Sequence, residues 1–154
     1  MDATTAKFEV YLKQHSINHT LKEYPMSVHT VEMAAGAVHG RVEDFIKTII
    51  LIDAKNETYA AILRGDDRIS MSRMAFNAKL DGLRLAKQDE VITRTGYAPG
   101  GIPPFGFPAR FIIDVKVPEM RFCWGGGGSD KSLVKLDPKD IIAHTNGTVV
   151  RITG

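Results

Sequence analysis

The sequence has a single cysteine, Cys123, among 154 residues. A lone cysteine cannot form an internal disulfide, which excludes a disulfide-stapled secreted scaffold and fits a reducing compartment. No apolar run reaches the ~20 residues needed to span a bilayer. The opening residues, MDATTAKFEVYL, resemble a capped helix and lack the charged-then-apolar pattern of a signal peptide. We therefore expect a cytoplasmic protein with no membrane contact.

An excess of charge of one sign is also missing. The chain carries 20 lysine and arginine residues against 18 aspartate and glutamate residues, a net charge of +2. This is too small to indicate nucleic-acid binding by bulk electrostatics, although a local basic patch is not excluded. A hydrophobic fraction of 44% is ordinary for a globular protein. With no repeat, linker or shift in composition, residues 1–154 are expected to form one domain.

The signatures of common catalytic and metal sites are absent as well. No serine lies in a G-x-S-x-G turn, so a hydrolase nucleophile of that kind is excluded. His15 and His19 have the spacing of helical metal ligands, but the expected helix ends between them, and a solvent-facing pair is favoured over a zinc site. We expect no metal, no cofactor and no side-chain nucleophile.

Apolar periodicity predicts an α+β protein with much β-structure. Thr4 or Thr5 is the expected cap of the first helix, Thr30 the N-cap of the second, and Gly40 its exit. Pro138 suits the first turn of the last helix. Helices are expected from residue 4 or 5 to about 15–17 and over 27–40, 72–80, 87–96 and 137–145, and strands over 19–25, 44–53, 57–64, 109–117, 121–124, 131–136 and 147–153. The expected architecture is a mixed, curled, barrel-like β-sheet surrounded by short helices.

A run of four glycines in WGGGGSDKS, residues 124–132, resembles a phosphate-binding loop. Such a loop needs glycine just before the lysine and a helix after it. Here Asp130 precedes the lysine, and SLVKLD alternates as a strand does, so a nucleotide loop is disfavoured. Two interpretations stay open: a mobile hairpin loop, or a wall without side chains against which another molecule lies.

Two further features are unusual. Residues 93–108, TRTGYAPGGIPPFGFP, hold four glycines and four prolines, so this loop is shaped, and it is either a structural crossover or a binding loop. Lys47 lies within FIKTIILI, the most apolar run of the chain. A lysine there either snorkels to the strand edge or serves as a rigid cation for a phosphate or carboxylate.

Together, Lys47 within IKTIIL, the block TGYAPGGIPPFG and the late GGGGSDKSLVKLDPKDI resemble the YbaK / prolyl-tRNA synthetase-associated editing domain family. The resemblance extends over nearly the whole chain, from INHTLKEYP onward. It implies a YbaK-like fold and a metal-free aminoacyl-tRNA deacylase. Such proteins hydrolyse the ester that joins a wrong amino acid to the 3′ end of a tRNA, typically the tRNA for proline.

The resemblance also assigns the site residues. Lys47 matches the family's essential lysine, and Thr30 and Tyr24 fall where pocket-lining residues are expected. The glycine and proline positions are Gly100, Gly101 and Pro104 in the pocket loop and Gly127 and Gly128 in the second glycine wall. Gly126, also expected to bind substrate, stands where other members have serine, so any role of that hydroxyl is lost here.

Such a site suggests a mechanism. The terminal 2′-hydroxyl of the tRNA would position or activate water, backbone N–H groups would stabilise the oxyanion, and Lys47 would hold a phosphate or polarise the ester. A small pocket would exclude the cognate amino acid by size. The removed amino acid (alanine, cysteine or serine), a transient prolyl-tRNA synthetase partner and the oligomeric state stay open. The competing hypothesis is a non-catalytic module that binds a tRNA 3′ end or a nucleotide.

Overall fold

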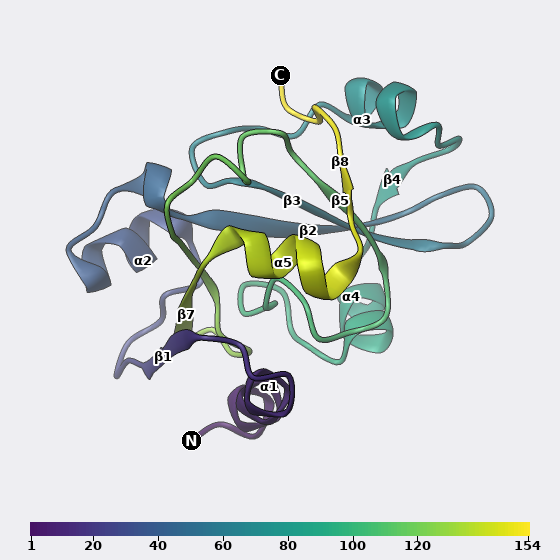
Figure 1. Ribbon diagram of the computed structural model, residues 1–154. Coiled ribbons are helices and arrows are strands. Elements are labelled where there is room, and N and C mark those ends of the chain that lie inside the picture. Colours follow the sequence, from purple (N-terminus) through teal and green to yellow (C-terminus); the bar gives the residue numbers. More distant parts are fainter.

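The computed structural model describes residues 1–154 and contains five α-helices and two β-sheets (Figure 1). The smaller sheet is antiparallel, with the strand order β1 (His19–Glu23), β7 (Ser132–Leu136), β6 (Cys123–Gly126). The larger sheet has the order β4 (Arg84–Leu85), β2 (Ile46–Ile52), β3 (Thr58–Arg64), β5 (Arg110–Ile113), β8 (Thr148–Val149). Its β3–β5 and β5–β8 pairs are parallel, so this sheet is mixed.

The predicted α+β architecture with a mixed sheet is confirmed, but the strands do not close into a barrel. One isolated parallel bridge joins Phe45, the residue directly before β2 of the larger sheet, to Trp124 of β6 in the smaller one. Beyond this bridge the two sheets separate. The main core cluster of 17 buried residues takes side chains from both sheets and from the helices at either end of the chain.

The helices follow local capping signals. α2 (Val31–Val38) begins where predicted, because the Thr30 hydroxyl accepts the Met33 N–H at 3.1 Å, but it ends in the left-handed residue His39 rather than at Gly40. The expected cap of α1 (Ala3–Gln14) was wrong: the Asp2 carboxylate accepts the Thr4 N–H at 2.8 Å. The other helices are α3 (Met71–Ala78), α4 (Gln88–Thr95), α5 (Pro138–Thr145), which has proline in its first turn as predicted, and the 3₁₀ turn η1 (Val42–Asp44).

Strand β2 is apolar on both sides because both of its faces are covered. Ile46 and Ile50 belong to the main core, whereas Leu51 packs with Met74 of α3 in a second cluster on the other face. A strand buried on both faces appears in the sequence as a continuous apolar run. Lys47 is therefore the one charged residue in an otherwise largely apolar and enclosed strand.

The glycine run forms the end of β6 and a tight turn into β7. The Gly127 N–H donates to the Ser132 carbonyl at 3.0 Å, and the Ser129 N–H donates to the Ser132 hydroxyl at 3.0 Å. A strand follows the turn, so the helix that a phosphate loop requires is missing. The Gly128 N–H donates to the Gly101 carbonyl at 2.9 Å, which joins this hairpin to the glycine- and proline-rich loop. No helix has the length and apolar character needed to cross a membrane.

Candidate active site

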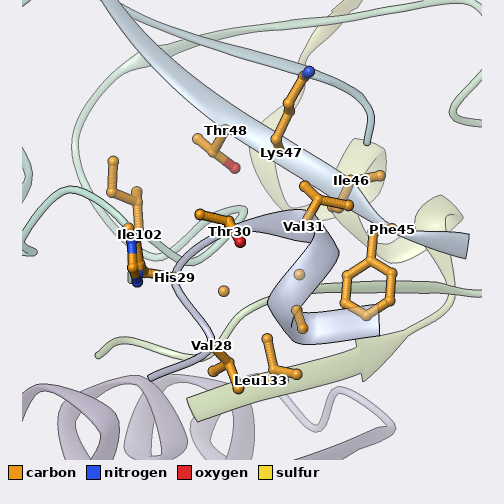
Figure 2. Close-up of a pocket in the computed structure, with 14 residues that line it drawn as sticks. Val28, His29, Thr30, Val31, Phe45, Ile46, Lys47, Thr48, Ile102 and Leu133 are labelled. Atoms are coloured by element: carbon orange, nitrogen blue, oxygen red, sulfur yellow. The ribbon is translucent and has the colours of Figure 1, made fainter. Parts of the chain in front are cut away.

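A cavity of about 190 Å³ opens where the two sheets separate, next to the first turn of α2 (Figure 2). Seven of its 14 lining residues are hydrophobic. The 14 lining residues come from four parts of the chain: Val28, His29, Thr30, Val31 and Ala34 at or just before α2; Phe45, Ile46, Lys47 and Thr48 at β2; Gly100 and Ile102 in the glycine- and proline-rich loop; and Gly125, Gly126 and Leu133 in the β6–β7 hairpin.

Two strand edges face this cavity without a pairing partner. The Gly65 N–H donates to the Phe45 carbonyl, so by the alternation of an antiparallel ladder Thr48 turns its N–H and C=O away from β3. On β6, the hydrogen bond from the Gly127 N–H to the Ser132 carbonyl fixes which residues pair with β7. Because hydrogen-bonding residues alternate along the strand, Gly126 directs its N–H and C=O away from β7. No strand pairs with Thr48 or Gly126 on these edges. The cavity therefore offers backbone donors and acceptors to a ligand.

Lys47 is half-buried at the side of the cavity and forms no ion pair. Its one hydrogen bond is long, 3.5 Å from Nζ to the Gly65 carbonyl. In Figure 2 the side chain extends from β2 on the side away from Val28 and Leu133, the apolar base of the pocket. A lysine with so little compensation is available to an anionic or strongly polar ligand.

The structure brings four of the predicted site residues to the cavity wall: Lys47, Thr30, Gly100 and Gly126. It does not bring the other five there. Tyr24 packs against the core cluster that contains Val28 and Leu133, and partial burial raises the pKa of its phenol. Pro104 is buried beside Gly125. The remaining three predicted residues that do not line the cavity are Gly101, Gly127 and Gly128.

The glycines of the two stretches allow the loop and the hairpin to interlock. A Cβ on Gly101 would lie 2.7 Å from the Ser129 carbonyl oxygen, and one on Gly126 would lie 2.9 Å from the carbonyl carbon of Ile102. A Cβ on Gly127 would likewise meet the backbone of β7, 2.8 Å from the Leu133 nitrogen. At these three positions glycine is needed because protein backbone, rather than a ligand, occupies the space of a side chain.

Sequence reasoning missed most of the cavity wall. His29 carried a usable signal, because a histidine directly before a helix N-cap lies at the end of a helix rather than on its buried face. Thr48 had a weaker signal, as the neighbour of Lys47. The apolar residues Val28, Val31, Ala34, Phe45, Ile46, Ile102 and Leu133 had none, since nothing local distinguishes a pocket-lining side chain from a core side chain; Gly125 was noted only as part of the glycine run.

Other candidate groups are excluded by their surroundings. Cys123 is completely buried, and burial raises the pKa of its thiol to about 12, so the thiolate needed for nucleophilic attack is not formed near neutral pH. No three histidine, cysteine, aspartate or glutamate side chains gather to form a metal site. No carboxylate lines the cavity.

Residues 26–143 match the sequence profile of the aminoacyl-tRNA editing domain. The chain belongs to this family. It is 25% identical over 135 residues to the uncharacterized protein YwhH of Bacillus subtilis (strain 168), covering 85% of this chain and 84% of YwhH. It is also 30% identical over 109 residues to the proline–tRNA ligase of Geotalea daltonii, where the match covers 70% of this chain but 19% of the ligase.

Solved structures agree with this membership. A protein provisionally described as a trans-editing enzyme for prolyl tRNA synthetase superimposes with a TM-score of 0.89 at 25% identity, covering 100% of this chain and 99% of that one. The hypothetical protein APE2540 gives a TM-score of 0.89 at 27% identity, with 96% of this chain and 99% of the other covered. This editing-domain chain thus corresponds to nearly the whole of that solved chain and, in sequence, to a segment of a much longer ligase.

Proposed function

We propose that the protein is an aminoacyl-tRNA deacylase that acts in trans. It hydrolyses the ester between a mischarged small amino acid and the 3′ end of a tRNA, with the tRNA for proline as the first candidate. The observation that carries the proposal is the cavity between the open edges of β2 and β6, because an editing-family chain here presents free backbone groups beside an unpaired lysine.

The chemistry needs little beyond these groups. An aminoacyl ester is already activated, so placing its carbonyl against preorganised N–H donors supplies much of the rate gain, with each donor worth ~10²–10³ in rate. The edges at Thr48 and Gly126 supply such donors. The 2′-hydroxyl of the terminal adenosine positions the attacking water, and Lys47 polarises the ester or holds the adjoining phosphate. Neither a metal nor a side-chain nucleophile takes part.

The size of the cavity limits the amino acid. At about 190 Å³ it is smaller than the ~300 Å³ at which pockets for drug-sized ligands begin, so a small side chain fits and a bulky one does not. Attraction alone discriminates weakly, since one methylene in a pocket is worth about 1–3 kcal/mol, whereas a rigid wall rejects a larger side chain by steric overlap. Phe45 and Leu133, both buried, form such a wall.

The alternative is a module that binds a tRNA 3′ end or a nucleotide without catalysis. A panel of mischarged tRNAs decides between the two: the tRNA for proline carrying alanine, cysteine or serine, with the correctly charged prolyl-tRNA as control. The deacylase proposal expects hydrolysis of at least one mischarged tRNA and sparing of the prolyl ester. Tight binding of the panel without hydrolysis would favour the module. Adding prolyl-tRNA synthetase to the same assay tests the proposed transient partnership.

A further inference from the structure

We infer that His29, oriented by Ser27, is the proton acceptor for the attacking water, a role that rests on the deacylase function proposed above. His29 lines the mouth of the cavity and is exposed. It directly precedes Thr30, the N-cap of α2, so the start of that helix fixes its backbone. In Figure 2 it lies on the side of the pocket away from Phe45.

Two contacts of the Ser27 hydroxyl support the imidazole tautomer that this role needs. The Ser27 hydroxyl oxygen lies 2.5 Å from Nδ1 of His29, and the same hydroxyl donates to the Asp130 carbonyl at 3.5 Å. The proposal assigns the Ser27 proton to that carbonyl, so that the Ser27 oxygen accepts the proton on Nδ1. In the neutral ring the lone pair then resides on Nε2. Ser27 is thus a positioning residue, and Nε2 is left free for substrate.

The segment that carries this pair is anchored to the hairpin. The Val28 N–H donates to the Asp130 carbonyl at 2.7 Å, so the same carbonyl holds both the backbone and the Ser27 side chain. Gly100 approaches from the other loop with a positive φ of +88°, and a Cβ there would lie 2.9 Å from Cβ of His29. A glycine at this position therefore keeps the mouth open beside the imidazole.

His29 is the only imidazole or carboxylate side chain that lines the cavity. No carboxylate lines the cavity. Lys47 serves as the cation in the proposed mechanism, and the hydroxyl of Thr30 already accepts the Met33 N–H. A positioned base typically contributes ~10²–10⁴ in rate. The imidazole of His29 is the group that can supply this contribution.

The step balances as follows. The water oxygen bonds to the ester carbonyl carbon while Nε2 of His29 takes one water proton, and the carbonyl π electrons move onto the oxygen held by backbone N–H groups. Collapse of this intermediate breaks the bond to the ribose oxygen. Nε2 returns its proton to that departing oxygen, which leaves a free amino acid and a tRNA with its terminal hydroxyl restored.

The test uses single-turnover hydrolysis of whichever mischarged tRNA the wild type cleaves best. His29→Gln keeps a polar side chain of similar reach but removes the base, and we expect the rate constant at saturating enzyme to fall by ~10²–10³ with tRNA affinity nearly unchanged. His29→Ala should lose as much and regain activity with added imidazole in proportion to its concentration. His144→Gln, the same change at an exposed histidine on α5, is the matched control and should keep the wild-type rate.

Ser27→Ala separates positioning from general structure. It should lower the rate by itself but cause no further loss in the His29→Gln background, because both changes remove one shared function. The proposed role would be overturned if the His29→Gln variant hydrolyses at the wild-type rate or loses only tRNA affinity. It would also be overturned if added imidazole does not restore activity to the His29→Ala variant. A wild-type protein inactive on the entire panel would instead overturn the deacylase function, and the role of His29 with it.

Discussion

The close approach of the two glycine-containing segments predicts the effect of adding a single methyl group. A Cβ on Gly101 would lie 2.7 Å from the Ser129 carbonyl oxygen, whereas ordinary contacts begin at 3.4 Å. Because the obstacle is backbone, no side chain can rotate away, and the loop or the hairpin must move by about 0.7 Å or more. Overpacking of this kind costs typically ~1–3 kcal/mol. Gly126→Ala meets the carbonyl of Ile102 and should behave in the same way.

The assay is a thermal melt beside the deacylation rate. For a chain of this size each kcal/mol lowers the melting temperature by roughly 2–4 °C, so Gly101→Ala should melt about 2–12 °C below wild type. The rate per folded molecule should also fall, since a 1 Å misplacement of reacting groups can cost ~10²-fold and the loop carries Gly100 and Ile102 of the cavity wall.

Gly36→Ala is the matched control. Gly36 lies exposed in α2, and a Cβ there meets nothing within 4 Å. Alanine is favoured over glycine within a helix by roughly 0.5–1 kcal/mol, so this variant should be slightly stabilised and fully active. If Gly101→Ala melts at the wild-type temperature, the loop and hairpin are not in the contact described, and the explanation of both glycines is wrong.

Four further outcomes follow from single groups. Lys47→Ala should lower the deacylation rate by at least ~10²-fold. The melting temperature should change little, because Lys47 forms no ion pair and its removal leaves no buried carboxylate without a partner. An unchanged rate would show that Lys47 takes no part in the mechanism. Cys123 should resist a thiol reagent in the native protein and react after denaturation; fast native labelling would contradict its burial. Deacylation should survive a metal chelator, and a loss restored by zinc would refute the metal-free mechanism. The pKa of Glu90 is lowered to about 2, chiefly by its hydrogen bond from Arg84. The contribution of Glu90 to folding stability is therefore present above its unfolded pKa, about 4.3, and is lost as the pH falls toward 2. Glu90→Gln should flatten that part of the stability profile in an acid titration, and an unchanged profile would show that the pair does not contribute to stability.

Local signals explain the parts of the fold that were predicted. Thr30 was identified as an N-cap because a hydroxyl before an apolar periodic segment acts within one turn. The strands β2 and β3 were predicted because each is an apolar run, and the polar residues between the two runs separate them. In the structure the Asp53 carboxylate accepts the N–H groups of Lys55 and Glu57, which closes the turn between the two strands.

Long-range pairing had no such signal. The parallel neighbours β3, β5 and β8 are far apart in the sequence, and each strand pattern is compatible with several partners. The expected strand over 147–153 shrinks to Thr148–Val149, because the chain then departs to give the Ile152 N–H to the Asp114 carboxylate at 2.9 Å. A buried carboxylate that captures a backbone N–H is a tertiary event that periodicity does not record.

The candidate site shows the same division. Lys47 was found because a charge within an apolar run conflicts with its surroundings, and such conflicts concentrate at functional sites. The glycines were found for a similar reason, but their physical role was different at Gly101 and Gly127, where backbone occupies the space assigned to a ligand. The direction in which a Cβ would point depends on φ and ψ, and what it would meet depends on the neighbouring segment. Neither can be predicted from a run of glycines.

The unpaired strand edges are the feature that connects this fold to its chemistry. A bare edge invites another strand, and proteins normally pair or cover it. Here the bridge between Phe45 and Trp124 starts a parallel pairing that would continue at Thr48 and Gly126, but the sheets separate first. The first turn of α2 and the loop at Ile102 then close the gap to a cavity too small for a strand. In the function proposed above, the backbone groups that this separation leaves unpaired bind the carbonyl and amino groups of an aminoacyl ester.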